Sequence, residues 1–174
     1  MAAFDKRRKR RVIYNDDSDQ QYLSYEGYGY EITDEQSFID TRTTPTFGTH
    51  VDTYVWCVGN GCDPPWGNTD RLRPCLGSHS HASDLIVEAC HSRGMEVWAS
   101  LRMNDIHDCF RDGLEDATDP IKARHPEYLI GNERTRQLPR ELTEHFLWSA
   151  FNFARPEVRQ YRRDFIERDA AAHD

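Results

Sequence analysis

The sequence predicts an α/β fold with a parallel sheet, on the evidence of three apolar runs and the helical connections between them. The runs cover residues 12–16 (VIYND), 51–58 (VDTYVWCV) and 95–103 (MEVWASLRM), and β-branched and aromatic residues are frequent in them. They follow one another at intervals of about 40 residues, which leaves room for a loop and a helix in each connection. Strands joined in this way pair in parallel through right-handed crossovers. We therefore expect about three βα units.

The first connection is expected to begin as a helix and to break before the second run. Thr33 is placed to cap this helix, Glu35 or Gln36 falls in its first turn, and Pro45 interrupts it. The second connection carries a more strongly marked helix, because its apolar residues recur at i, i+3, i+4, i+7 and i+8. These residues are Ala82, Leu85, Ile86, Ala89 and Cys90. Gly94 suits the C-terminal end of that helix.

A further helix is predicted to begin at Pro156, because proline is favoured at the first helical position and Glu157 follows it. Its expected core face consists of Val158, Tyr161, Phe165 and Ile166. About 50 residues separate this helix from the third run. Long connections that follow the carboxyl ends of barrel strands commonly shape a substrate cleft.

Composition limits the classes of partner. The chain has 174 residues and a formal net charge of -8, which argues against general nucleic-acid binding because phosphate neutralisation needs a basic surface. The basic run at residues 6–11 is interpreted as a solvated lead-in, with a targeting or polyanion-binding arm as the alternative. No apolar stretch of the length of a signal peptide or membrane span is found, so a cytoplasmic protein without membrane contact is expected.

Cysteine and histidine patterns do not favour a metal site. Five cysteines, an odd number and without a CxxC pair, predict free thiols, although Cys57 and Cys62 could bridge or bind a metal. His79 and His81 form an HxH pair, but they lie at a helix entrance rather than at a strand end. No metal or other cofactor is therefore predicted.

The third run changes character along its length. Alternation places Val97, Ala99, Leu101 and Met103 on one face, and this set is wholly apolar. The other face carries Trp98, Ser100, Arg102 and Asn104, and it becomes more polar toward the carboxyl end. This gradient is expected where the inner face of a (β/α) barrel opens into its site. We expect Val97, Ala99 and Leu101 to pack on helices, and Arg102 and Asn104 to face the barrel side.

Polar and aromatic residues also follow the other two runs, which suggests a carbohydrate site. Carboxylates and amides bind hydroxyl groups, and an aromatic ring stacks on a sugar face. The candidate substrate-binding residues are Asp16, Asp17, Trp66, Arg102, Asn104, Asp105 and His107. Three alternative roles stay open: an anchor of a loop for Trp66, a cap of the next helix for Asp16 and Asp17, and a pairing of Arg102 with either aspartate that holds strands together.

Four segments, in this order, resemble the glycosyl-hydrolase-like family 10 type of barrel. They are "RRVIYNDD", "GMEVWASLRMNDIHD", "HPEYLIG" and "FNFARPEVRQYRRDFIERD", and together they extend over nearly the whole chain. The resemblance implies the N-terminal portion of a (β/α)8 TIM barrel, with long loops on the C-terminal rim, in a protein that acts on oligo- or polysaccharides. The corresponding domain would cover residues 12–174 and continue beyond the C-terminus.

The chain departs from the family in length. A full TIM barrel takes about 250 residues, and three βα units cannot close it. In retaining glycosidases of related barrels the two catalytic carboxylates come from strands four and seven. We therefore expect a glycoside hydrolase fragment that binds substrate, lacks its catalytic carboxylates and self-associates through the exposed sheet edge. The alternatives are a non-catalytic sugar-binding or scaffolding domain, and a metal-dependent hydrolase using His79, His81, Asp105 and His107.

Overall fold

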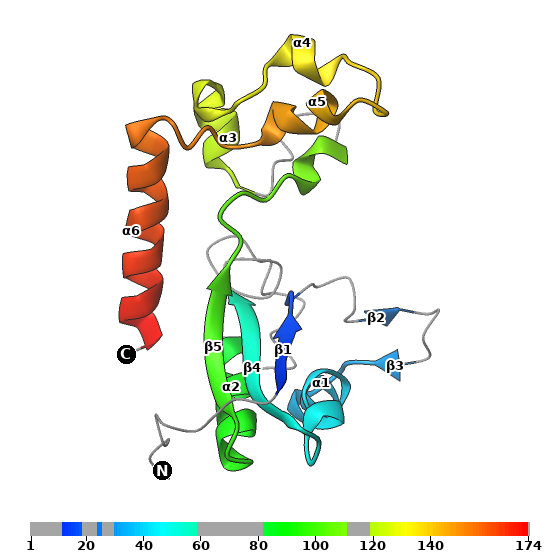
Figure 1. Cartoon of the computed structure of the whole chain (residues 1–174). Coiled ribbons are helices and arrows are strands. Elements are labelled where there is room, and N and C mark those ends of the chain that lie inside the picture. The colour runs from blue at the N-terminus through cyan, green and yellow to red at the C-terminus, as the bar shows by residue number, and fades with distance from the viewer. Residues whose placement is uncertain (1–11, 19–23, 26–29, 59–81, 111–118, 174) are drawn as a thin grey trace. The chain divides into compact units, whose positions relative to one another are not determined.

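The computed structural model describes residues 12–18, 24–25, 30–58, 82–110 and 119–173 (Figure 1). The chain divides into two compact units, Met1–Arg102 and Met103–Asp174. A parallel sheet with helices forms the first unit, and the described part of the second unit is built from helices.

The sheet of the first unit contains β1 (Val12–Asp16), β4 (Val51–Val58) and β5 (Glu96–Leu101). All pairs are parallel, in the order β1-β4-β5, so the mixed α/β class and the parallel sheet are confirmed. β5 is shorter than the predicted run 95–103, because the chain leaves the sheet at Arg102. Alternation therefore does not extend to Asn104, which lies in the second unit.

Two further strands form a small antiparallel sheet that the sequence did not predict. β2 (Ser24–Tyr25) pairs with β3 (Tyr30–Glu31). With two residues in each strand, neither is long enough to give a visible alternation of apolar and polar side chains.

Helix α1 (Glu35–Arg42) follows this hairpin, and its N-cap differs from the prediction. Asp34, not Thr33, is the cap, because the Asp34 carboxylate accepts the Ser37 amide while the Ser37 hydroxyl accepts the Asp34 amide. The helix ends before Pro45, which lies in a short 3-10 turn, so the predicted break is confirmed.

Helix α2 (Ala82–Ser92) confirms the predicted helical face. Four of the five residues of that predicted face are buried, and the fifth, Ala89, is half-buried. Gly94 has a φ of 71°, and the Met95 amide donates to the Cys90 carbonyl at 3.0 Å. The helix therefore ends in the left-handed cap that Gly94 predicted.

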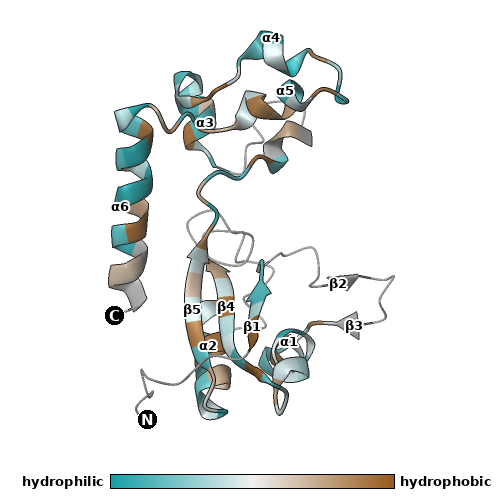
Figure 2. Ribbon diagram, in the orientation of Figure 1, coloured by the Kyte–Doolittle hydropathy of each residue, from teal (hydrophilic) through white to brown (hydrophobic). Residues whose placement is uncertain are grey.

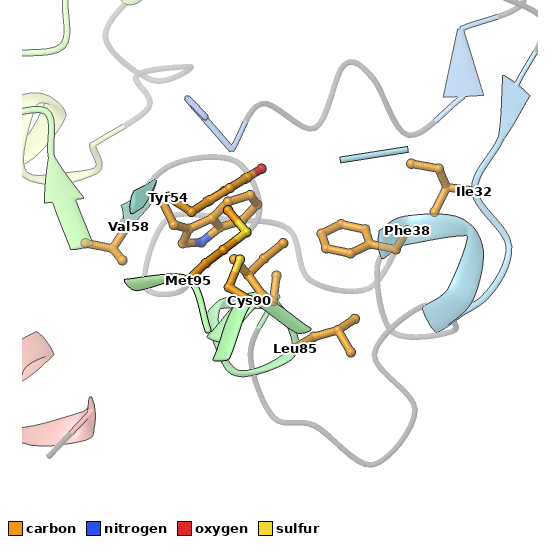
Figure 3. Packing of buried hydrophobic residues seen from close by; sticks show 10 residues of the cluster. Ile32, Phe38, Tyr54, Val58, Leu85, Cys90 and Met95 are labelled. Atoms are coloured by element: carbon orange, nitrogen blue, oxygen red, sulfur yellow. The ribbon is translucent and has the colours of Figure 1, made fainter. Parts of the chain in front are cut away.

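The core of the first unit lies between one face of the sheet and these two helices (Figure 3). Tyr54 and Trp56 from β4 pack with Phe38 of α1 and Ile86 of α2, and all four are almost fully buried. Trp56 and Phe38 meet edge to face, with ring centroids 6.3 Å apart.

The predicted orientation of the third strand is confirmed for Val97 and Leu101. Val97 and Leu101 pack against this core, while Trp98 lies on the opposite face and is 41% exposed. Ala99 is exposed, contrary to expectation. β5 is an outer strand of this sheet, so its side chains are covered less completely than those of the central strand β4.

The second unit begins with a 3-10 turn at His107–Phe110 and continues through α3 (Ile121–Arg124), α4 (Glu133–Arg136) and α5 (Thr143–Phe146). One further 3-10 turn, Pro126–Tyr128, lies between α3 and α4, and another, Leu147–Ser149, follows α5. An isolated antiparallel bridge between residues 129 and 151 ties the segment together.

Helix α6 (Pro156–His173) begins where the sequence predicted. Val158 and Phe165 are buried and Tyr161 is half-buried, but Ile166 is 45% exposed. Arg162 is buried instead, because it lies four residues after Val158 and three before Phe165 on the same face. Hydrophilic and hydrophobic residues interchange along α6 in Figure 2. Among the described residues, no helix combines the length and apolar character needed to cross a bilayer.

Candidate functional site

The carboxyl end of β1 holds a buried carboxylate, that of Asp16. Its Oδ1 accepts the Arg42 guanidinium at 2.7 Å and the Ser18 amide at 2.8 Å, and its Oδ2 accepts the Tyr54 hydroxyl at 2.6 Å. Both carboxylate oxygens are therefore engaged inside the protein. Asp16 caps no helix here; it connects β1, β4 and the end of α1.

The partners of Asp16 are held by the aromatic core. The Arg42 guanidinium lies 5.9 Å from the centroid of the Phe38 ring and 5.7 Å from that of Trp56, so ring faces surround the buried cation. Burial, together with the charge of Asp16, raises the pKa of Tyr54 well above its ordinary value. The phenol therefore stays protonated and remains a donor.

Asp17 and Arg102 form the accessible part of this end of the sheet. Asp17 follows β1 and Arg102 follows β5, and their charged groups meet at 2.5 Å. Their side chains are 54% and 33% exposed. The Asn15 side chain also donates to Asp17 at 2.9 Å. The pairing of Arg102 with one of the two aspartates is thus confirmed, and Asp17 is the partner.

Three other predicted residues lie in the second unit. Asn104 bonds to the backbone of Phe151: its Oδ1 accepts the amide at 2.8 Å and its Nδ2 donates to the carbonyl at 3.3 Å. Asp105 Oδ1 accepts the amide of His107 at 2.8 Å and lies 2.7 Å from its Nδ1. His107 itself is exposed. Asn104 and Asp105 thus organise the start of the second unit.

Two buried cations of the second unit, Lys122 and Arg162, were not predicted from the sequence. Lys122 is almost fully buried, and its ammonium donates to the Asp105 carbonyl at 2.6 Å. The Phe151 ring lies 5.2 Å from this ammonium and 4.7 Å from the Arg162 guanidinium. One aromatic ring therefore contacts two cations.

Asp119 provides the buried negative charge of this cluster. Its Oδ1 accepts the Tyr161 hydroxyl at 2.9 Å, and its Oδ2 lies 3.3 Å from Arg162. Burial lowers the pKa of Arg162, and burial beside Asp119 raises the pKa of Tyr161. The cluster joins α6 to the segment before α3. The sequence does contain one sign of this cluster, because Arg162 lies among the apolar residues on the buried face of α6.

The remaining candidates lie outside the described residues. These are Trp66 and the HxH pair of His79 and His81. Within the described ranges, no three His, Cys, Asp or Glu side chains gather as a metal site. Cys57 and Cys90 are free thiols, as predicted.

No family model and no curated protein matches this chain. Asp17 and Arg102 are brought together at one sheet end beside buried Asp16, and Asp105 and His107 are brought together in the second unit. Asp17 is the accessible carboxylate of the first group, and it has both an acceptor oxygen and an adjacent guanidinium. Such a pair can bind vicinal hydroxyls, since each hydroxyl both donates and accepts.

Proposed function

We propose that this chain forms the first strands of a (β/α)8 barrel of the glycosyl-hydrolase-like family 10 type, and that it contributes substrate-binding residues to a carbohydrate site. The supporting observation is the strand order β1-β4-β5, in which successive strands lie side by side and Asp17 and Arg102 meet at their carboxyl ends. Active sites of such barrels lie at that end.

Binding without bond cleavage is the role proposed for the described residues. Glycosidases place an acid and a second carboxylate on either side of the scissile bond, about 5 to 9.5 Å apart. Asp16 is buried with three donors, and Asp105 is turned toward His107. The second candidate function is a non-catalytic sugar-binding domain. It is favoured because Asp16 and Asp105 already accept hydrogen bonds from within the protein and are not placed to act on a substrate.

Equilibrium binding of cello-, xylo- and manno-oligosaccharides to the full chain tests the proposal. Asp17→Asn and Arg102→Gln should each weaken binding about ten- to hundredfold, since a charge-assisted hydrogen bond contributes roughly 1.5 to 3 kcal/mol. The Asp164→Asn variant is the control, because Asp164 is exposed on α6. Aryl glycosides should not be hydrolysed. Turnover by a monodisperse monomer that Asp16→Asn or Asp105→Asn abolishes would contradict the proposal.

A further inference from the structure

The chain leaves β1 through a strained turn at Ser18. The φ of Ser18 is 53°, and no other residue of the described ranges except glycine has a positive φ. Serine rarely adopts this left-handed conformation, because its Cβ then lies close to the following carbonyl oxygen. Ser18 is also completely buried, although it directly follows the exposed Asp17. Strain of this kind persists only where surrounding contacts hold it, and it is concentrated at functional sites.

Two hydrogen bonds hold Ser18 in this conformation. Its amide donates to Asp16 Oδ1 at 2.8 Å, and its hydroxyl donates to the Cys57 carbonyl of β4. The first bond closes the turn around Asp17, and the second fixes the turn to the neighbouring strand. The Asp16 carboxylate is itself held by two further donors of the buried core. The turn is therefore anchored to the most rigid part of the first unit.

The hydroxyl anchor of Ser18 lies near the end of β5. Cys57 is paired with Ser100 in the register of β4 and β5, and Arg102 follows two residues later. The chain after β1 is therefore tied to the part of the sheet at which β5 ends. Asp17 lies between two buried residues, yet its own side chain is 54% exposed and meets Arg102.

A side-chain contact fixes the Asp17 carboxylate as well. Asn15 Nδ2 donates to Asp17 Oδ1 at 2.9 Å, while the Arg102 guanidinium contacts Oδ2. Each carboxylate oxygen therefore has a different partner, and the plane of the group is set. The Ser18 turn holds the main chain at Asp17, and Asn15 holds its carboxylate.

We infer that Ser18 is a positioning residue of the Asp17–Arg102 pair. Ser18 is fully buried and acts without touching a ligand, by keeping the chain in the left-handed turn that presents Asp17 to Arg102. A preorganised pair loses less conformational freedom when it binds, so the turn raises affinity without a contact of its own. That the ligand is a saccharide rests on the proposed function, whereas the effect of Ser18 on the pair is independent of it.

Two substitutions at Ser18 separate the turn from the hydroxyl bond. Ser18→Ala and Ser18→Gly both delete the hydroxyl, so both lose the bond to Cys57. Glycine adopts a positive φ without steric cost, whereas alanine favours a return to negative φ. Ser18→Gly should therefore keep the Asp17–Arg102 pair, and Ser18→Ala should lose it. The control is Ser92→Ala, because the Ser92 hydroxyl donates to a backbone carbonyl of α2 at 2.7 Å.

The first measurement needs no ligand. NMR of the Arg102 guanidinium in the full chain follows rotation about its Cζ–Nη bonds, which an ion pair slows. Rotation should be equally slow in the wild type, Ser18→Gly and Ser92→Ala. It should be at least about threefold faster in Ser18→Ala and faster still in Asp17→Asn, since the left-handed penalty of alanine corresponds to about tenfold in population.

The second measurement is equilibrium binding of the cello-, xylo- and manno-oligosaccharides, at a temperature at which circular dichroism shows every variant to be folded. Ser18→Ala should weaken binding about tenfold, in line with the same penalty. Ser18→Gly should weaken it by less than about twofold, because glycine retains the turn. A hydroxyl that only stabilised the fold would change the melting temperature and leave both measurements on the folded protein unchanged.

The outcomes separate this role from the proposed function. Unchanged Arg102 rotation in Ser18→Ala overturns the positioning role. Faster rotation in Ser18→Gly also overturns it, even if Ser18→Ala does not fold. If no oligosaccharide binds but rotation follows the expected order, the proposed function fails and the positioning role of Ser18 stands.

Discussion

Asp16 and Asp17 are adjacent in the chain, yet the Asp16 carboxylate is buried against Arg42 and the Asp17 carboxylate meets Arg102 at the surface. Asp16 is the last residue of β1 and Asp17 is the first residue after it, so the chain leaves the strand between them. The two ion pairs therefore differ in burial. The buried Asp16–Arg42 pair is suited to stabilising the fold, and the accessible Asp17–Arg102 pair is suited to binding a ligand.

Replacing each aspartate separates these settings. Asp16→Asn should reduce the free energy of unfolding by about 3 to 5 kcal/mol, because it leaves the buried Arg42 cation without its counter-charge. Asp17→Asn should change it by only about 0 to 1 kcal/mol, since that pair is solvated. Urea unfolding followed by circular dichroism measures both values. Equal losses would contradict the assignment of Asp16 to the core.

Gly131 should be intolerant of any side chain. In the Gly131→Ala variant the added methyl group would overlap the Trp148 backbone, where no flexible side-chain end can move away. We expect a loss of about 1 to 3 kcal/mol from overpacking. Gly48→Ala is the control, because its positive φ carries strain but its Cβ meets nothing within 4 Å. Thermal melts of the two variants should show the larger loss for Gly131→Ala.

The cap of α1 should give a pH-dependent contribution to stability. The Ser37 amide donates to the Asp34 carboxylate and lowers the pKa of that group below its ordinary value of 3.8. A lowered folded-state pKa means that the contribution is present above pH 3.8 and is lost as the pH falls through the folded value. Asp34→Asn keeps the acceptor oxygen without the charge. The difference in melting temperature between wild type and Asp34→Asn should therefore shrink on acidification.

Cys90 should resist alkylation in the folded protein. Burial raises the pKa of its thiol from 9.0 to about 12, and the thiolate is the reactive form. Iodoacetamide at pH 9 should leave Cys90 unmodified in the native chain and modify it in urea, as peptide mass spectrometry can show. The same shift predicts a contribution that is complete below pH 9.0 and is lost as the pH rises toward 12. Rapid native labelling of Cys90 would contradict this burial.

Local sequence patterns were sufficient for much of the first unit. The strands at 12–16 and 51–58 were predicted with their observed ends, because apolar runs stop there at acids or glycine. Helix α2 was predicted from its 3.6-residue periodicity and from Gly94. In the second unit, the start at Pro156 was equally local, but helices of four residues such as α3–α5 are too short to show a period.

The buried charges could not be predicted in the same way. Arg42 lies 26 residues from Asp16, and Tyr161 lies 42 residues from Asp119, so neither pairing leaves a local signal. Arg162 was passed over because a charged residue in a helix is normally placed on the solvent side. The sequence predicted, as an alternative, that Arg102 pairs with Asp16 or Asp17, because all three residues lie at strand ends of one predicted sheet, but it did not distinguish the two aspartates.

The order of strands in the sheet has a consequence for how the chain acquires its structure. Each strand lies beside the strand that precedes it in this sheet, over sequence separations of 39 residues between Ser18 and Cys57 and 43 between Thr53 and Glu96. Every strand of this sheet has therefore been synthesised before residue 103 is added. The sheet can assemble one strand at a time during synthesis, as units of multidomain chains commonly do. Loop closures of this length make that assembly slower than the formation of a helical segment such as α6.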